Sequence, residues 1–433
     1  MRTEPLDIRR TRFPNRLRLL IWENQQLPLV TVLGVVRAGA DCNPTDRAGL
    51  AAITARLLED GTVRFPAETV LEMIENVGSS LSTFSQRELS GVILTSSPDH
   101  LCQGLELVAE MLQSPVFPPD RFLLERERSL NDVQALEDEP HQVANDLLDS
   151  LIYAGTPLAL PLMGTEQSLR DIRREDLLSY HSRNFGPANT ILVVVGSCRP
   201  EEVEEQAAGL FGSWTNPHFL SPPALEVKRQ TRRQSCSRQL SKEQVHLCMG
   251  HLAITRMNPD YPALQLLDVI LGSGPGFTSR IPRKLRDELG LAYSAYSDIT
   301  SSSGVYPGRF VAYAGTAPEK RNQALDALLR EIEDIRENGV TQEELETAQS
   351  FLTGSFVFDF QSNADVARFL VLTELFDLPE DYPQRHLGEI RAIDRQEVAR
   401  VARVHLDTLN YSVVCVGPVD EESQLDSSLP EDL

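Results

Sequence analysis

The sequence predicts an α+β protein of two similar lobes, each a mostly antiparallel sheet with helices packed on one side. Three observations support this fold class. The 433 residues exceed the roughly 100–200 residues of a single domain. Short apolar strand patterns alternate with long helical patterns. The two halves also end alike, since Asn189 and Gly196 bound an apolar strand and Asn410 and Gly417 bound another one 221 residues later. Such a long repeat indicates two related lobes and not a solenoid.

Each half begins with apolar strands and continues with a hairpin and long helices. Runs of β-branched residues and turn signals predict the strands and hairpins, and apolar residues at helical spacing predict the helices. The predicted strands are 17–22, 29–37 and 245–251, the hairpins are 83–97 and 294–313, and the helices include 121–138 and 342–353. Hairpin-connected strands combined with helices on one side are typical of the α+β class.

The division of the chain follows from one stretch with the composition of a linker. Residues 216–241 contain Pro217, Pro222 and Pro223 and a basic, polar run over 228–238. We therefore predict an N-terminal lobe over 1–215, a linker over 216–241 and a C-terminal lobe over 242–433.

Composition and charge exclude several classes of function. The formal net charge of −22 argues against nucleic-acid binding, which requires a basic surface. No apolar run reaches the roughly 18 residues of a membrane span, and the first 15 residues lack the apolar core of a secretory signal. We therefore expect a cytoplasmic protein. The six cysteines contain no C-x-x-C pair and the eight histidines no H-x-x-x-H spacing, so no cluster of metal ligands is predicted.

An amphipathic run over 48–62 reads AGLAAITARLLEDGT. It resembles the zinc-binding helix of the pitrilysin/insulinase peptidases, which include the mitochondrial processing peptidase. Active members carry His-x-x-Glu-His on this helix, which supplies two imidazole ligands and a general base. The matching positions here are Ala52, Ala55 and Arg56. Alanine neither ligates nor accepts a proton, and a guanidinium repels a divalent cation. The resemblance therefore predicts a degenerate metal site.

The same resemblance places the third metal ligand at Asp132, seven residues after Glu125 in the Glu125-Arg126 pair. A single carboxylate on a helix is most often a solvated charge. Because Arg56 stands where an imidazole would be, however, we expect Arg56 and Asp132 to form an ion pair at the position of the metal. A separation beyond about 4 Å would contradict this hypothesis.

A second stretch, LGSGPGFTSRIPRKLRDELGLAYS over 271–294, resembles the part of the family that carries an Arg/Tyr pair. Arg286 and Tyr293 occupy the matching positions. The resemblance implies that both donate hydrogen bonds to the substrate backbone near the scissile carbonyl. Taken alone, Arg286 is a surface charge near a helix end and Tyr293 an amphipathic strand residue. Within the whole stretch we favour the functional interpretation.

The resemblance covers 17 to about 417 and implies that the two lobes face each other around a clam-like chamber. A lost metal site with a retained Arg/Tyr pair predicts the non-catalytic subunit of a heterodimeric zinc metalloendopeptidase, inactive alone and without a cofactor of its own. A catalytic His-x-x-Glu-His partner would hold the zinc and cleave peptides or unfolded segments. One alternative is a structural subunit similar to the core proteins of respiratory complexes. The other is an active enzyme with unconventional ligands.

Overall fold

The computed structural model describes residues 7–275 and 278–419. The chain divides into two compact units, and neither unit is continuous in sequence. Unit 1 consists of Met1–Gln134, Leu160–Ala224 and Val357–Tyr382, and unit 2 consists of Ala135–Ala159, Leu225–Phe356 and Pro383–Leu433. Compared with the linear division predicted above, each unit therefore contains one segment from the other half of the chain.

The sheet of unit 1 has the strand order β1-β2-β6-β3-β5-β4. Neighbouring strands are antiparallel, except for the parallel pair β2 and β6. The central strands β3 and β6 read VTVLGVV and TILVVVG and are buried throughout, as expected for strands covered on both faces. The strands are β1 (Ile8–Arg12), β2 (Arg18–Glu23), β3 (Val30–Val36), β4 (Ser80–Ser85), β5 (Ser90–Ser96) and β6 (Thr190–Gly196).

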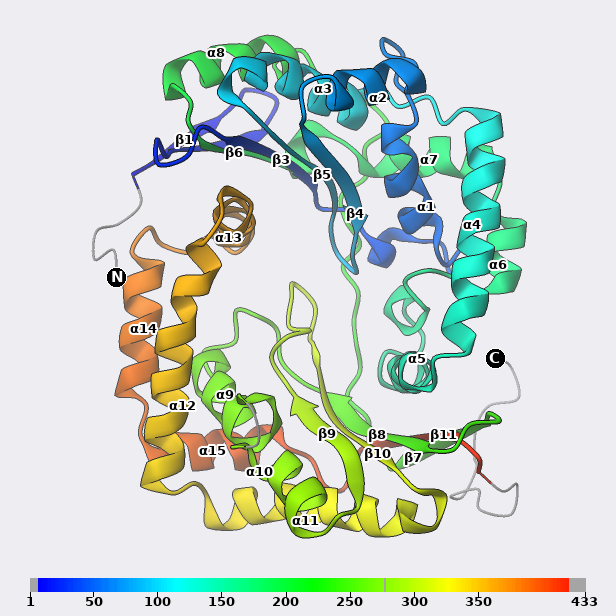
Figure 1. The fold of residues 1–433 in the computed structure, drawn as a ribbon, viewed down its shortest axis with the longest axis vertical. Coiled ribbons are helices and arrows are strands. Elements are labelled where there is room, and N and C mark those ends of the chain that lie inside the picture. The colour runs from blue at the N-terminus through cyan, green and yellow to red at the C-terminus, as the bar shows by residue number, and fades with distance from the viewer. Residues whose placement is uncertain (1–6, 276–277, 420–433) are drawn as a thin grey trace. The chain divides into compact units, whose positions relative to one another are not determined.

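Helices lie on both faces of this sheet (Figure 1). α3 and α8 cover one face, where the main apolar cluster of unit 1 lies. α13, from the C-terminal half of the chain, covers the opposite face, and its Leu370 joins Leu33 and Val193 in a separate buried cluster. The α+β class is confirmed, with this one helix added on the second face. The helices are α1 (Leu50–Arg56), α2 (Ala67–Glu75), α3 (Leu101–Gln113), α4 (Pro119–Glu137), α6 (Glu166–Asp171), α7 (Arg174–Asn184), α8 (Pro200–Phe211) and α13 (Asn363–Leu375).

The sheet of unit 2 has the order β7-β11-β8-β10-β9, again antiparallel except for one pair, β7 and β11. β7 lies inside the predicted linker, so the end of that stretch belongs to the sheet. No periodic apolar pattern marks it, because its side chains are half-buried or exposed. The strands are β7 (Gln234–Gln239), β8 (Val245–Leu252), β9 (Ala292–Asp298), β10 (Arg309–Thr316) and β11 (Ser412–Gly417).

Helix α5, from the N-terminal half of the chain, packs on one face of this sheet against β8 and β11, and α11 packs on the other face (Figure 1). The segments over 269–273 and 283–288 are π-helical. None of the helices within residues 7–275 and 278–419 is long and apolar enough to cross a membrane. The helices are α5 (Pro140–Ile152), α9 (Tyr261–Asp268), α10 (Arg280–Pro282), α11 (Arg321–Asn338), α12 (Gln342–Ser355), α14 (Tyr382–Ala392) and α15 (Arg395–His405).

The two sheets repeat one topology, as the sequence predicted. β6 and β11 each lie between a parallel and an antiparallel neighbour, and each ends in a glycine with positive φ: Gly196 at 135° and Gly417 at 142°. A Cβ atom on Gly196 would lie 2.2 Å from the carbonyl oxygen of Leu29, and one on Gly417 would lie 2.3 Å from that of Gln244. Only glycine fits at either strand end.

Candidate functional site

The predicted degenerate metal site lies on α1. Gly49 has a φ of 87° and introduces the helix, and Arg56 is its last residue. Ala52 and Ala55 are buried, with exposed fractions of 6% and 1%. Ala52 and Arg56 are four residues apart and therefore share one face of the helix. This face thus presents a methyl group and a guanidinium at the positions that carry two imidazoles in active relatives.

Arg56 bridges two carboxylates of α4. Its Nη1 atom lies 2.9 Å from Oδ2 of Asp132 and 2.9 Å from Oε1 of Glu125. The predicted ion pair between Arg56 and Asp132 is therefore present. Burial lowers the pKa of the Arg56 guanidinium, but the hydrogen bonds and charges of Glu125 and Asp132 outweigh burial and raise the pKa overall. A permanently cationic group thus lies between the acidic residues.

The sequence analysis did not identify Glu125 as a partner of Arg56. Glu125 precedes Asp132 by seven residues, which is close to two helical turns, so both carboxylates point from the same face of α4. That spacing in the sequence could have predicted Glu125 as a second partner of Arg56. Glu125 is also the more buried of the two, with 10% of its side chain exposed against 50% for Asp132. Across the described ranges 7–275 and 278–419, no group of three or more His, Cys, Asp or Glu side chains is arranged to hold a metal ion.

The second predicted feature, Arg286 and Tyr293, is brought together in unit 2. Arg286 lies in the π-helical segment over 283–288, and Gly290, with a φ of 57°, turns the chain into β9, which carries Tyr293. The Cζ atom of Arg286 is 5.9 Å from the centre of the Tyr293 ring. Both side chains are exposed, at 42% for Arg286 and 78% for Tyr293 as a whole residue. Two hydrogen-bond donors therefore lie side by side at the surface of unit 2.

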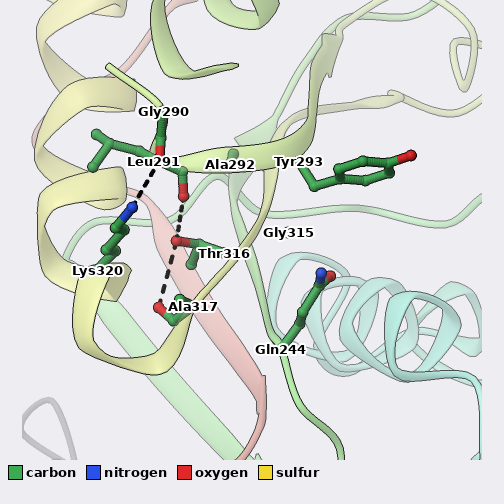
Figure 2. Close-up of a pocket in the computed structure, with 9 residues that line it drawn as sticks. All are labelled: Gln244, Gly290, Leu291, Ala292, Tyr293, Gly315, Thr316, Ala317 and Lys320. Atoms are coloured by element: carbon green, nitrogen blue, oxygen red, sulfur yellow. Dashed lines mark hydrogen bonds between the residues drawn. The ribbon is translucent and has the colours of Figure 1, made fainter. Parts of the chain in front are cut away.

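A pocket of about 290 Å³ adjoins Tyr293 (Figure 2). Two hydrogen bonds fix its wall: Lys320 Nζ donates to the carbonyl oxygen of Gly290 at 3.0 Å, and Thr316 Oγ1 donates to that of Leu291 at 2.6 Å. The ammonium and phenol groups at its rim are donors suited to carbonyl or carboxylate oxygens. No sequence pattern predicts this pocket, because β9, β10 and the residues just before β8 and α11 bring its lining together. The lining residues are Gln244, Gly290, Leu291, Ala292, Tyr293, Gly315, Thr316, Ala317 and Lys320.

Two α+β units, with the Arg56 guanidinium between Glu125 and Asp132 where the resemblance predicts a metal, indicate a peptidase-like chain of the non-catalytic type. The chain belongs to the insulinase family, peptidase family M16. Residues 19–166 match the family model described as Insulinase (Peptidase family M16), and residues 171–352 match the model described as Peptidase M16 inactive domain. The second match includes both Arg286 and Tyr293.

Relatives are similar along nearly the whole chain. The "Uncharacterized zinc protease YmxG" of Bacillus subtilis (strain 168) is 22% identical over 413 residues, which cover 95% of this chain and 98% of the relative. The "Probable mitochondrial-processing peptidase subunit beta, mitochondrial" of Arabidopsis thaliana is 23% identical, covering 96% and 79%. Among solved structures, the peptidase M16 inactive domain from Pseudomonas fluorescens has a TM-score of 0.87 at 23% identity and covers 96% of this chain and 98% of its own. This last likeness concerns the fold.

Proposed function

We propose that this chain is the non-catalytic subunit of a heterodimeric zinc metalloendopeptidase. The observation that carries the proposal is the exposed pair of Arg286 and Tyr293, which lie together while Arg56 fills the metal position. The two exposed donors lie in the stretch that the family resemblance assigns to contacts with the substrate backbone. The resemblance to processing peptidases, which work as two chains, supports the presence of a partner, and so does the word "subunit" in the name of the Arabidopsis relative.

In this proposal the partner contributes the His-x-x-Glu-His helix and the zinc ion, which activates water for attack on the peptide. This chain contributes hydrogen-bond donors to the substrate. The Arg286 guanidinium offers several N–H donors, and the Tyr293 phenol donates one hydrogen bond. Both stabilise negative charge on a carbonyl oxygen as the tetrahedral intermediate forms. Because these groups contact the backbone, the proposed substrates are peptides or unfolded segments, and this chain alone is inactive.

The test is cleavage by the complex of this chain with its His-x-x-Glu-His partner. We expect Arg286→Ala and Tyr293→Phe in this chain to lower kcat by about 10–100-fold, somewhat below the loss of a complete oxyanion donor. Lys284→Ala is the matched control, since Lys284 lies on the same segment and forms a surface ion pair with Glu288 at 2.8 Å. Size-exclusion chromatography checks that each variant still forms the complex.

The rival function is a structural subunit with no part in proteolysis. It predicts that Arg286→Ala and Tyr293→Phe leave kcat and KM unchanged. That result, obtained with an intact and active complex, would refute the proposed function.

A further inference from the structure

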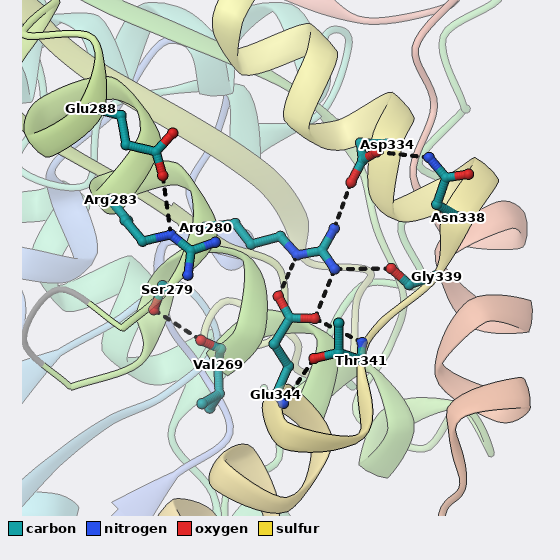
Figure 3. Close-up of polar contacts among 10 residues, drawn as sticks. All are labelled: Val269, Ser279, Arg280, Arg283, Glu288, Asp334, Asn338, Gly339, Thr341 and Glu344. Carbon is teal, nitrogen blue, oxygen red and sulfur yellow. Dashed lines mark hydrogen bonds and ion pairs between the residues drawn. The ribbon is translucent and has the colours of Figure 1, made fainter.

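Arg280 is a buried guanidinium at the start of the segment that carries Arg286 and Tyr293 (Figure 3). Only 7% of the residue is exposed. Its Nε and Nη2 atoms donate to the two carboxylate oxygens of Glu344 at 2.7 and 2.8 Å, and Nη1 donates to Asp334 Oδ2 at 2.9 Å. Nη2 also donates to the carbonyl oxygen of Gly339 at 3.0 Å. This planar, bidentate geometry is specific to arginine, because a lysine ammonium cannot reproduce the fork.

The partners of Arg280 belong to two helices and the turn between them. Asp334 lies on α11, Gly339 follows the end of α11, and Glu344 lies in the first turn of α12. Glu344 is itself held, because its Oε2 atom accepts from the backbone N–H of Thr341 at 2.8 Å while Thr341 Oγ1 accepts from the backbone N–H of Glu344 at 3.2 Å. Arg280 is therefore bound to a site that is already rigid.

The segment that follows Arg280 is anchored by Ile281 and Leu285, which are both fully buried. The carbonyl oxygen of Leu285 accepts from the backbone N–H of Leu291 at 2.7 Å. Residues 283–288 are π-helical, a conformation that is rare and is frequent at functional sites. Arg286 projects from this segment and Tyr293 from β9. Both side chains are exposed, so core packing of their own does not fix their positions.

We propose that Arg280 is a positioning residue, which fixes the π-helical segment and thereby the place of Arg286 beside Tyr293 on β9. Its effect on catalysis rests on the proposed function, whereas its effect on the segment does not. A donor that is displaced by about 1 Å can lose most of its catalytic value. Loosening of the start of the segment therefore lowers kcat while leaving the binding of the remainder of the peptide, and thus KM, largely in place.

The first experiment uses this chain alone. Hydrogen–deuterium exchange of peptides covering 283–293 is compared with exchange in the rest of unit 2, for the wild type, Arg280→Lys and Glu344→Gln. Both variants keep the approximate size of the side chain, and exchange in the rest of unit 2 reports whether the fold is retained. We expect exchange over 283–293 to accelerate by about 10-fold in both variants, because local opening reports local stability. Lys284→Ala, which removes a surface ion pair, should leave it unchanged. A uniform change across unit 2, or no change, would overturn the inference.

The second experiment measures kcat and KM in the complex with the catalytic partner. For Arg280→Lys we expect kcat to fall by about 10-fold with KM within about twofold. If Arg286→Ala lowers kcat but Arg280→Lys behaves like Lys284→Ala, the positioning role is wrong and the proposed function stands. If Arg286→Ala has no effect, the proposed function fails, and the exchange experiment alone decides whether Arg280 fixes the segment.

Discussion

Replacement of Arg56 by methionine tests how the protein stabilises its filled metal position. The change removes the cation but keeps most of the side-chain volume. Among the residues that the structure describes, it leaves the buried Glu125 with only Ser129 Oγ at 3.4 Å and Arg128 Nη1 at 3.8 Å. A hydrogen bond to a charged, buried group contributes about 1.5–3 kcal/mol. The bond to the half-exposed Asp132 contributes at most about 1 kcal/mol, because solvent screens it. We therefore expect Arg56→Met to lower the free energy of unfolding by about 2–4 kcal/mol.

Urea unfolding followed by tryptophan fluorescence measures this change selectively. The only tryptophans in the sequence, Trp22 and Trp214, are both buried in unit 1, which also contains Arg56. Asp132→Asn is the matched control and should cost no more than about 1 kcal/mol. A loss below about 0.5 kcal/mol for Arg56→Met, or an equal loss for the control, would show that the buried carboxylate does not depend on the guanidinium.

Two further predictions concern unit 2. Burial lowers the pKa of His251 and of His386 to about 4, so between about pH 6.5 and 4 the unfolded chain binds protons that the folded protein does not. The contribution of each histidine to the free energy of unfolding is therefore fully present above about pH 6.5 and falls by about 1.4 kcal/mol per pH unit as pH decreases. Urea midpoints measured by circular dichroism against pH should lose this slope when both histidines are replaced by glutamine. Gly272→Ala places a Cβ atom 2.1 Å from the backbone nitrogen of Ser297. This change should lower the free energy of unfolding by about 1–3 kcal/mol, measured by thermal unfolding. Gly354 has open space around it, so Gly354→Ala should not destabilise the protein.

The sequence predicted side-chain contacts best where the family resemblance supplied the geometry. The ion pair between Arg56 and Asp132 followed from the positions that the resemblance assigns to metal ligands, and it is present at 2.9 Å. The ion pairs of Arg280 with Asp334 and Glu344 could not be predicted, because these partners lie 54 and 64 residues away and only the packing of α11 and α12 brings them close. An arginine followed by a proline-containing helix gives no sign of burial.

The assignment of helices to sheets was also out of reach of the sequence. Most strands and the mostly antiparallel sheets followed from apolar runs and turn residues, whereas β1 and β7 were not predicted. The repeat ending in Gly196 and Gly417 was visible directly. An amphipathic pattern, however, shows that α5 and α13 bury one face without showing which sheet receives it. Helix propensity and periodicity are local properties, whereas the choice of sheet is decided by the whole chain.

Helices α5 and α13 each pack on the sheet formed mainly by the other half of the chain, and this arrangement affects folding during synthesis. The second apolar face of the sheet in unit 1, with Trp22 and Leu33, is covered by a helix that ends at residue 375. A nascent chain that has emerged only as far as residue 224 holds all six strands of that sheet and still lacks its cover. Most of the second half of the chain must therefore be translated before the sheet of unit 1 is covered on both faces. A truncated chain that ends at residue 224 should aggregate through the uncovered apolar face of this sheet.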